Sequence, residues 1–399
     1  MRVMTIFGTR PEVMKLAPII HALERQDRGV ASVVCSTGQH REMLGPLCQF
    51  LGIKPDIELD VMTRNQTLED LTGRLVAALG SVVREVRPNW IVAQGDTTTV
   101  FVAALVAFYQ KIGFAHVEAG LRTGDLRQPF PEEMNRRFAD MVADLHFAPT
   151  ELARQRLLNE GVPAARIHVT GNTIVDTLMQ VAALPYDWSI APFRELSDCD
   201  RLVLVTAHRR ESFGNPLREL CHAIRELAEC FAPRDVTFVF PVHPNPSVQG
   251  PVHEILGEIS NIMLLRPLDY LSLINLLRRA TLVITDSGGI QEEAPSFGIP
   301  LLVARERTER PEGVSIGVAK LVGTTRDRIV AEASRLLTDP KAHAAMVKRV
   351  NPYGDGRAAQ RIVAALLDGT AIGELRDRGA LRAGARGALA AMNPIALEA

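Results

Sequence analysis

Short apolar runs rich in β-branched residues alternate with longer helical patterns from one end of the 399-residue chain to the other. The runs include RVMTIF, ASVVCST, WIVAQ, FAHV, RLVLVT, VTFVFPV, TLVITD and PLLVA. Nearly continuous apolar character is typical of strands buried on both faces, and strands that alternate with helices form right-handed βαβ units. The pattern therefore predicts an α/β fold with doubly wound, mostly parallel sheets.

The chain is too long for one ordinary core, so we expect two domains. The stretch ALPYDWSIAPFRELSDCD contains prolines and shows little periodicity, which is typical of a connector or peripheral loop. On this basis we expect two Rossmann-like domains, residues 1–170 and 171–352, facing each other across a cleft. Residues 373–399 are rich in Ala, Gly and Arg with weak periodicity, and we interpret them as a disordered tail.

Charge and cysteine content argue against several classes of protein. A formal net charge of −1 provides no general attraction for nucleic acid or for an anionic membrane. We find no apolar run long enough to cross a bilayer and no signal-peptide core after Met1. The five cysteines form no CxxC pair, which favours reduced thiols in the cytoplasm over a disulfide framework or a zinc site. No GxGxxG or Walker sequence follows a predicted strand.

Polar strings follow nearly every predicted strand. They are GTRPE, TGQHRE, QGDTTT, EAGLR, TAHRRE, PVHPNP, TDSGG and ARERTERPE. Because ligands bind outside the carboxyl ends of strands in open parallel sheets, we expect these strings to line the cleft between the domains.

Two of the strings could bind an anion. In TDSGGIQEE, backbone amides at a helix start could bind phosphate and Glu292 or Glu293 could hold ribose hydroxyls, although Asp286 or Ser287 could equally be an ordinary N-cap. In FGTRPEVMK, Arg10 and Lys15 lie one helical turn apart and could contact phosphate, although single surface cations are common.

The remaining candidates could transfer protons. Asp96 follows a strand, but Thr-Thr-Thr after it makes an N-cap an alternative. Glu118 also follows an apolar strand, where partial desolvation would raise the pKa of its carboxyl, and an ion pair with Arg122 is the alternative. His208 is a candidate phosphate ligand or general acid, and a structural histidine is its alternative. His243, between prolines, is a weaker candidate of the same kind.

The segment HVEAGLRTGDLRQPFPEE ends in two adjacent carboxylates, Glu132 and Glu133. The segment shows little helical or strand periodicity, so we expect an extended loop. Adjacent side chains in extended backbone point in roughly opposite directions. The two glutamates are therefore expected to serve two different pockets.

Taken in order, the strings resemble the non-hydrolysing bacterial UDP-N-acetylglucosamine 2-epimerases. Matching motifs run from about Met1 to Leu367, among them FGTRPEVMKLAP, HVEAGLRTGDL, PFPEEMNRR, VTGNTIVDTL, VTAHRRESFG, TDSGGIQEEAPSFGIP and NPYGDG. The resemblance implies the glycosyltransferase-B architecture, with a C-terminal helix in residues 353–372 that crosses back onto the first domain. It also implies a homodimer that converts UDP-GlcNAc reversibly into UDP-ManNAc for cell-surface polysaccharide, with no NAD or metal.

The resemblance further implies a role for each matching residue. UDP would be eliminated to give 2-acetamidoglucal and then added back, with C-2 reprotonated on the other face. The catalytic set would be Asp96, Glu118, Glu132 and His208. The substrate would be bound by Arg10, Lys15, Ser287, Gly288, Gly289, Glu293 and Arg310. A regulatory UDP-GlcNAc molecule would be bound by Gln39, His40, Arg64, Glu133, Arg209 and His243.

Two positions depart from the family pattern. Gln94 stands where relatives often have His, and Leu273, in a segment expected to be a loop, stands where an aromatic residue near uracil is expected. Three alternatives remain open, namely a hydrolysing epimerase, a retaining UDP-sugar glycosyltransferase of the same architecture, and a non-enzymatic UDP-sugar sensor.

Overall fold

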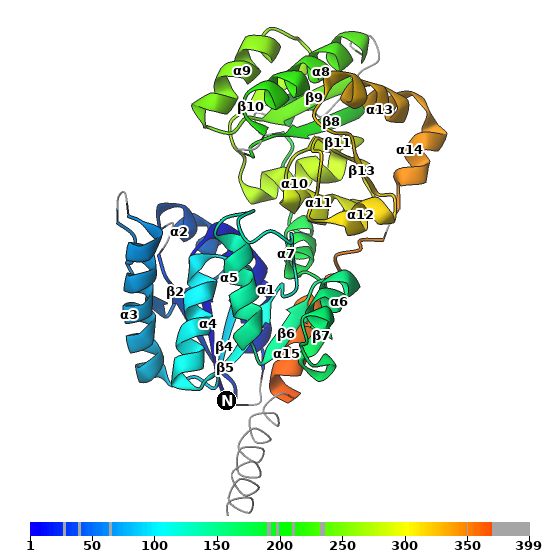
Figure 1. Ribbon diagram of the computed structural model, residues 1–399. Coiled ribbons are helices and arrows are strands. Elements are labelled where there is room, and N and C mark those ends of the chain that lie inside the picture. The colour runs from blue at the N-terminus through cyan, green and yellow to red at the C-terminus, as the bar shows by residue number, and fades with distance from the viewer. Residues whose placement is uncertain are drawn as a thin grey trace, which may run out of the picture.

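The computed structural model of the protein describes residues 1–26, 29–38, 41–63, 66–189, 193–196, 199–209, 212–231, 236–348 and 350–368. Three predicted site residues, Gln39, His40 and Arg64, lie outside the described residues, as does the predicted tail. Figure 1 shows two α/β halves, one above the other, each built around a sheet with helices on both faces.

Both sheets are parallel and doubly wound. Within the described residues, the first sheet has seven strands in the order β3-β2-β1-β4-β5-β6-β7, and the second has six in the order β10-β9-β8-β11-β12-β13. In each sheet the first three strands in sequence run outward to one side of β1 or β8, and the chain then returns to add the next strand, β4 or β11, on the other side. This is the Rossmann arrangement. The predicted fold class is confirmed. The strands are β1 (Arg2–Phe7), β2 (Ala31–Ser36), β3 (Ile57–Glu58), β4 (Trp90–Gln94), β5 (Gly113–Val117), β6 (Leu145–Ala148), β7 (Ile167–Val169), β8 (Arg201–Thr206), β9 (Val236–Pro241), β10 (Ile262–Leu265), β11 (Leu282–Thr285), β12 (Leu301–Val303) and β13 (Ala319–Leu321).

Helices connect the strands and cover both faces of each sheet (Figure 1). They are α1 (Arg10–Glu24), α2 (Arg41–Phe50), α3 (Leu68–Val86), α4 (Thr98–Gln110), α5 (Glu132–Val142), α6 (Glu151–Asn159), α7 (Thr173–Ala182), α8 (Asn215–Phe231), α9 (Pro246–Leu256), α10 (Tyr270–Arg279), α11 (Gly288–Glu293), α12 (Pro311–Ser315), α13 (Arg326–Thr338), α14 (Pro340–Met346) and α15 (Ala358–Asp368).

The strands were predictable where they are long and buried. All residues of β4 and β11 are buried, as continuous apolar runs indicate. Each of the eight apolar runs contains a strand, whereas β3, β6, β7, β10 and β13 were not predicted. These five strands have only two to four residues, too few for a periodic pattern to stand out.

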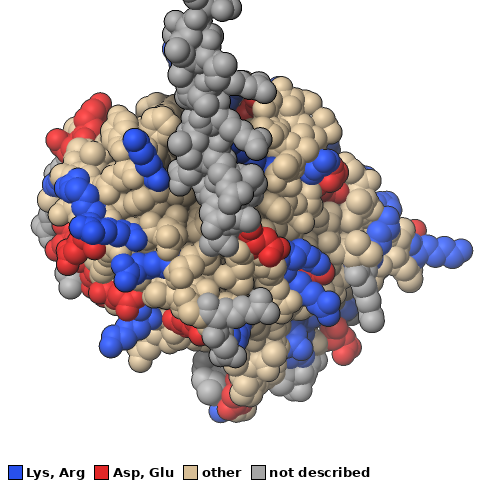
Figure 2. All heavy atoms as spheres, turned by 90° about the horizontal axis from the view of Figure 1, so that it is seen from below, with Lys and Arg blue, Asp and Glu red and all other residues tan. Residues whose placement is uncertain are grey.

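Charges are mixed on the part of the surface that the structure describes. Figure 2 shows basic and acidic side chains interspersed over the face seen from below, with neither sign gathered into a single field outside the grey atoms. Among the described helices, none combines the length and apolarity needed to cross a membrane.

The chain crosses between the halves twice. The first crossing, residues 170–172, leads from β7 into α7. The second, residues 350–357, leads into α15, which packs its apolar face into the core of the first half (Figure 1). The crossings are joined where the Asn172 backbone N–H donates to the Tyr353 carbonyl at 2.6 Å. Asp176 of α7 accepts the first two amides of α15, at 3.1 and 2.9 Å, and so caps that helix.

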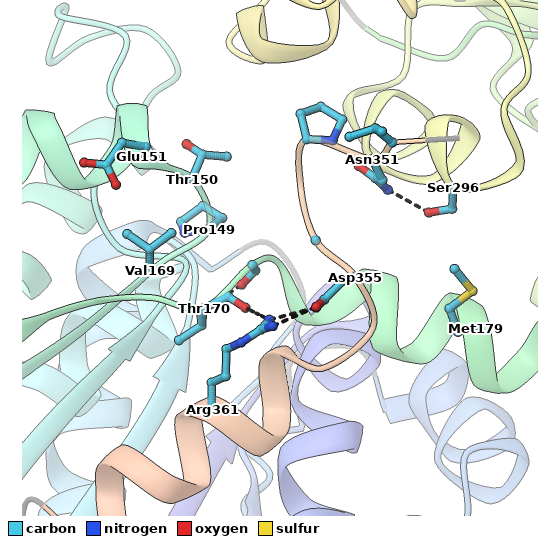
Figure 3. A pocket seen from close by; sticks show the side chains of 14 residues that line it. Pro149, Thr150, Glu151, Val169, Thr170, Met179, Ser296, Asn351, Asp355 and Arg361 are labelled. Atoms are coloured by element: carbon cyan, nitrogen blue, oxygen red, sulfur yellow. Dashed lines mark hydrogen bonds and ion pairs between the residues drawn. The ribbon is translucent and has the colours of Figure 1, made fainter. Parts of the chain in front are cut away.

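A cavity of 480 Å³ lies between these crossings (Figure 3). Arg361 of α15 donates to the Asp355 carboxylate at 2.7 Å and to the Thr170 carbonyl at 3.0 Å, and these contacts join the two crossings at one side of the cavity.

Candidate functional site

A second cavity, of 360 Å³, lies at the carboxyl ends of β1, β4 and β5 and is closed from the other side by the second half. Six of the residues predicted from the sequence line it: Lys15, Asp96, Glu118, Glu132, Arg209 and Arg310. Residues more than 200 positions apart in the chain therefore meet at one site between the two sheets. This is where open parallel sheets bind ligands.

Glu12 fixes the first loop of the site. Its buried carboxylate accepts the backbone N–H groups of Gly8 and Thr9 at 3.0 and 2.7 Å, which completes a capping box at the start of α1. The same carboxylate accepts the Thr97 hydroxyl at 2.7 Å and so ties the loop after β1 to the loop after β4. Burial raises the pKa of Glu12 despite these donors. Lys15, one turn into α1, is thereby held over the end of β5.

Glu118 is held by three side-chain donors. It follows β5 with φ of 67°, a left-handed conformation that is unfavourable for a residue other than glycine. Lys15 Nζ donates to its Oε1 at 2.7 Å, Asn172 Nδ2 donates to the same oxygen at 3.0 Å, and Gln94 Nε2 donates to Oε2. This close contact with Gln94 gives that departure from the family pattern a role in the site.

The expectation that the pKa of Glu118 is raised was wrong. Burial does act in that direction, but the nearby charges of Lys15 and Arg310, with the hydrogen bonds to Glu118, lower the pKa below its ordinary value. The alternative of an ion pair with Arg122 was also wrong. Arg122 pairs instead with Asp140 and Glu160, at 2.8 and 2.6 Å. The carboxylate is therefore ionised and held by partners that a ligand could displace.

Asp96 is not the cap of the helix that follows it. Thr97 caps α4 by accepting the Val100 amide at 3.3 Å, so the N-cap alternative was wrong. The Asp96 carboxylate instead pairs with the guanidinium of Arg136, and Asn135 Nδ2 donates to the Asp96 carbonyl at 2.9 Å. Arg136 was not singled out from the sequence, although it lies one helical turn after Glu132, at a spacing that places both side chains on one face of a helix.

Glu132 and Glu133 begin α5 rather than lying in an extended loop, which corrects the prediction. Their neighbourhoods nevertheless differ. Glu132 lines the cavity, whereas Glu133 is fully buried. The Glu133 carboxylate accepts the backbone amides of Thr123 and Gly124 at 3.1 and 3.4 Å and lies 3.4 Å from Arg136.

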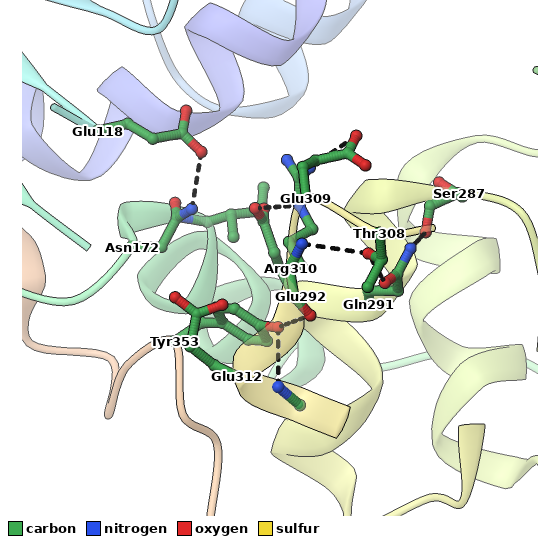
Figure 4. A network of polar contacts seen from close by, with 12 residues as sticks. Glu118, Asn172, Ser287, Gln291, Glu292, Thr308, Glu309, Arg310, Glu312 and Tyr353 are labelled. Carbon is green, nitrogen blue, oxygen red and sulfur yellow. Dashed lines mark hydrogen bonds and ion pairs between the residues drawn. The ribbon is translucent and has the colours of Figure 1, made fainter. Parts of the chain in front are cut away.

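The second half contributes guanidinium groups paired with carboxylates (Figure 4). Arg310 Nε donates to Glu292 at 2.7 Å, Arg209 donates to Glu309 at 2.8 Å, and Lys15 lies 3.5 Å from Glu292 across the interface. Burial disfavours the ionised Glu309, but Arg310, Arg209 and Arg305 lower the pKa of Glu309 to about 2. Glu292 was considered from the sequence only as a ribose ligand, and Glu309 was not assigned, because ARERTERPE gave only a charged string.

Gly288 lies directly against these cations. A Cβ at this position would lie 2.9 Å from Arg209 Nη2 and 3.0 Å from Arg310 Cζ, so a larger residue would push these guanidinium groups away from the start of α11. The glycine therefore lets two guanidinium groups pack against the start of α11. Two positive charges next to backbone amides make a suitable environment for phosphate.

The other predicted residues that the structure describes do not line this cavity. Arg10 is exposed at the start of α1, Ser287 is the N-cap residue of α11, and Gly289 is the second residue of that helix. The His208 and His243 rings are stacked, with centroids 6.1 Å apart, and the buried Asp286 accepts the backbone amides of His208 and Arg209. Desolvation of the His208 ring lowers its pKa, and Asp286 acts against that shift.

Glu293 is buried beside an aromatic residue. Its carboxylate accepts the Tyr270 hydroxyl at 3.0 Å, and burial raises the pKa of Glu293 to about 7. Tyr270 and Leu273 belong to α10, so the expectation of a loop there was wrong. Leu273 packs against the core of the second half, which explains an aliphatic residue at this position.

Comparisons with known proteins agree with this geometry. A family model described as UDP-N-acetylglucosamine 2-epimerase matches residues 21–367. The chain is 47% identical to the UDP-N-acetylglucosamine 2-epimerase of Escherichia coli K12 over 372 residues, which are 92% of this chain and 98% of that one.

Solved structures give the same result. The UDP-GlcNAc 2-epimerase of Neisseria meningitidis, bound to UDP-GlcNAc, is 41% identical with a TM-score of 0.84, covering 92% of this chain and 100% of that one. The Methanocaldococcus jannaschii UDP-GlcNAc 2-epimerase, in complex with UDP-GlcNAc and UDP, is 34% identical with a TM-score of 0.74, at the same coverage.

Proposed function

The chain belongs to the UDP-N-acetylglucosamine 2-epimerase family, and from this premise we propose that it interconverts UDP-GlcNAc and UDP-ManNAc at C-2. The observation that carries the proposal is the 360 Å³ cavity, in which Asp96, Glu118 and Glu132 lie together with Lys15 and several guanidinium groups. Carboxylates can move the C-2 proton, and cations can stabilise a diphosphate as it leaves.

Elimination and re-addition fit this set of groups. The carbon at C-2 has no neighbouring carbonyl group, so direct removal of its proton would leave a carbanion without resonance stabilisation. If the C-1 to oxygen bond breaks as a carboxylate takes the proton, the electron pair forms the double bond of 2-acetamidoglucal and UDP departs. UDP then adds back to C-1 while a carboxylic acid on the other face protonates C-2. The ionised Glu118 is suited to accept a proton, and Asp96 and Glu132 supply further carboxylates.

The diphosphate would meet Arg310 and the backbone at Ser287 to Gly289, and Glu293 would hold the ribose. Support comes from the packing of Arg310 on Gly288. Because Arg310 and Lys15 are paired with Glu292 and Glu118, phosphate binding would replace existing partners rather than neutralise free cations. Arg10 and His208 would contact the diphosphate once the halves close around it.

One assay separates this proposal from its alternatives. The protein is incubated with UDP-GlcNAc alone in deuterium oxide and followed by NMR. Reversible formation of UDP-ManNAc with deuterium at C-2 is expected. Free ManNAc with UDP would indicate a hydrolysing epimerase, and turnover that begins only when an acceptor sugar is added would indicate a glycosyltransferase. Binding without any turnover would indicate a sensor.

We also propose that UDP-GlcNAc activates the enzyme from a regulatory site formed by Gln39, His40, Arg64, Glu133, Arg209 and His243. Arg209 lines the cavity that holds the carboxylates, so a second nucleotide sugar bound to it would adjoin the substrate. The buried Glu133 carboxylate accepts the backbone amides of Thr123 and Gly124, so Glu133 would act by ordering the loop that contains these two residues. An activator must bind the active state more tightly than the inactive one.

Activation predicts a lag in the reverse reaction. UDP-ManNAc alone should react slowly until a little UDP-GlcNAc is added, and the forward rate should be sigmoidal in substrate. Glu133→Gln should flatten that curve. Full-rate conversion of UDP-ManNAc alone, with no lag, would exclude the regulatory role.

A homodimer through α4 and α5 is the assembly we propose. Phe101 and Phe138 pack edge to face and join the two helices, which expose Phe108, Tyr109 and Met141 by 59%, 68% and 78%. Exposed apolar side chains grouped on neighbouring elements mark interfaces. Sedimentation velocity of Tyr109→Glu/Met141→Glu should give a monomer, with Leu184→Glu, on a different surface, as control. A dimer that persists in the double variant would place the interface elsewhere.

We place the enzyme in the cytoplasm, where its product would supply cell-surface polysaccharide. All five cysteines are free, which fits a reducing compartment. Fractionation of cells that express the protein tests the location, and recovery with the membranes after a high-salt wash would contradict it.

A further inference from the structure

Asn172 lies in the first crossing and uses all of its polar groups. Its Oδ1 accepts the Ile174 amide at 3.1 Å and caps α7, and its backbone N–H donates to the Tyr353 carbonyl at 2.6 Å. Since Oδ1 is committed to a backbone donor, the amide nitrogen must face the other way. There Nδ2 donates to Glu118 Oε1 at 3.0 Å (Figure 4). The residue is 3% exposed, so water does not compete for these bonds.

The donors on Glu118 come from two parts of the molecule. Lys15 and Gln94 belong to the first half, whereas Asn172 belongs to the crossing. The φ of Glu118 lies in the left-handed region, a strain that persists only when surrounding contacts enforce it. The amide of Asn172 is one of those contacts, and it is neutral, so it orients the carboxylate without neutralising it.

The crossing that holds Asn172 also reaches the cations of the second half. Tyr353, which accepts the Asn172 amide, donates its hydroxyl to the Arg310 carbonyl at 3.0 Å and accepts the Gly313 amide at 3.1 Å. Gly171 and Gly354 pack closely, since a Cβ on Gly171 would lie 3.1 Å from the Gly354 Cα. A continuous chain of hydrogen bonds therefore runs from the Arg310 backbone through Tyr353 and Asn172 to the Glu118 carboxylate.

We propose that Asn172 is a positioning residue for Glu118, which fixes the orientation of that carboxylate and ties it to the crossing between the two halves. The inference rests on the proposed function, in which Glu118 transfers a proton. Helix capping alone does not require an asparagine, because Ser and Asp cap as well as Asn does. What distinguishes asparagine is a second, donating group that reaches Glu118.

Two variants separate positioning from capping. Asn172→Ser retains a capping oxygen but loses the donor to Glu118. Asn172→Asp keeps the shape and the cap, removes the donor and sets a second carboxylate against Glu118. Asn245→Ser is the matched control, because Asn245 caps α9 through the Ser247 amide without a contact to the cavity. Melting temperatures and kinetics are measured for all four proteins.

The kinetic signature is specific. We expect the kcat of Asn172→Ser to be lower than that of the wild type by about tenfold or more, with KM changed by less than about threefold. The kcat of Asn172→Asp should be lower still. Lys15 and Arg310 face Glu118 and lower the pKa of its carboxyl, and the Asn172 hydrogen bond adds to their effect. The limb of the pH profile that reports Glu118 should therefore move to higher pH in both variants. Asn245→Ser should match the wild type.

A measurement without substrate tests the same contact. The cycle of Asn172→Ser, Glu118→Ala and the double variant is followed by urea unfolding at pH 7. Because the bond involves an ionised group, the effects on the unfolding equilibrium constant should be non-additive by on the order of tenfold. An additive cycle would overturn the inference, as would wild-type kcat and pH profile in Asn172→Ser. If the wild-type protein does not introduce deuterium at C-2, the proposed function fails. The double-mutant cycle still tests the contact between Asn172 and Glu118 in that case.

Discussion

Replacing Glu293 by glutamine should change the free energy of unfolding in a pH-dependent way. The variant should gain stability relative to the wild type as the pH rises. Glu293 is 5% exposed, and burial raises the pKa of its carboxyl to about 7 from an ordinary value of 4.5. The Tyr270 hydroxyl and the charge of Lys15 act in the opposite direction, while Glu292 adds to the increase. Glutamine has nearly the same shape and can still accept the Tyr270 hydroxyl, but it cannot ionise.

The sign follows from proton binding in the two states. Between the unfolded and folded pKa values, the folded protein holds the proton on Glu293 and the unfolded chain does not. The stabilisation from a neutral Glu293 is therefore complete below about pH 4.5 and is lost as the pH rises through about 7. The difference between 4.5 and about 7 corresponds to roughly 3 kcal/mol, at about 1.4 kcal/mol per pH unit. Glutamine avoids this loss.

Urea unfolding of both proteins at pH 5, 6, 7 and 8 measures the effect. The free energy of unfolding of Glu293→Gln, minus that of the wild type, should rise by about 2–3 kcal/mol from pH 5 to pH 8. Glu258→Gln is the matched control, since its exposed side chain is solvated in both states and should give a flat difference. A flat difference for Glu293→Gln, within about 0.5 kcal/mol, would refute the argument. The same variant should weaken UDP binding by about tenfold if Glu293 holds the ribose.

Two further predictions concern the catalytic residues. Asp96→Asn, Glu118→Gln and Glu132→Gln should each lower kcat for epimerisation by about 10²–10⁴-fold, measured by NMR, because each removes a group that can transfer a proton. Near-normal activity of Asp96→Asn would leave the ion pair with Arg136 as the role of Asp96. Arg10→Ala and His208→Ala should lose most turnover with little change in melting temperature, since Arg10 is exposed and the His208 side chain is 45% exposed. Normal kcat in either variant would remove that residue from the site.

The architecture could be predicted because the physics that sets it is local. Strands buried on both faces must be apolar throughout, so the eight runs were recognisable without knowledge of their partners. Alternation with helices then fixes parallel pairing through the handedness of the connections. The short strands β3 and β13 are placed by their neighbours in the sheet, and nothing in two or three residues indicates that.

The membership of the site was partly predictable and its electrostatics were not. Lys15, Asp96 and Glu118 lie in the segments that follow β1, β4 and β5, whose carboxyl ends share one sheet edge, and the sequence indicates this. Glu132 begins a helix that the sequence did not indicate. The pKa of Glu118, however, depends on Lys15 from α1 and Arg310 from the second half. Those contacts join residues far apart in the chain. Desolvation could be foreseen from an apolar strand, whereas the charges that outweigh it come from the tertiary structure.

The prediction that Glu132 and Glu133 have different environments is correct, but the reason given for it was wrong. In extended backbone, adjacent side chains point apart by about 180°, and that geometry was the basis for expecting two pockets. In α5 the separation is about 100° around the helix axis. That is enough to turn Glu132 into the cavity and Glu133 inward, where it accepts the amides of Thr123 and Gly124. A carboxylate in the first turn of a helix is favoured by the helix dipole in either orientation. The first turn of α5 can therefore accommodate both carboxylates. The packing of residues 123–124 against Glu133 leaves Glu132 as the one that a ligand can contact.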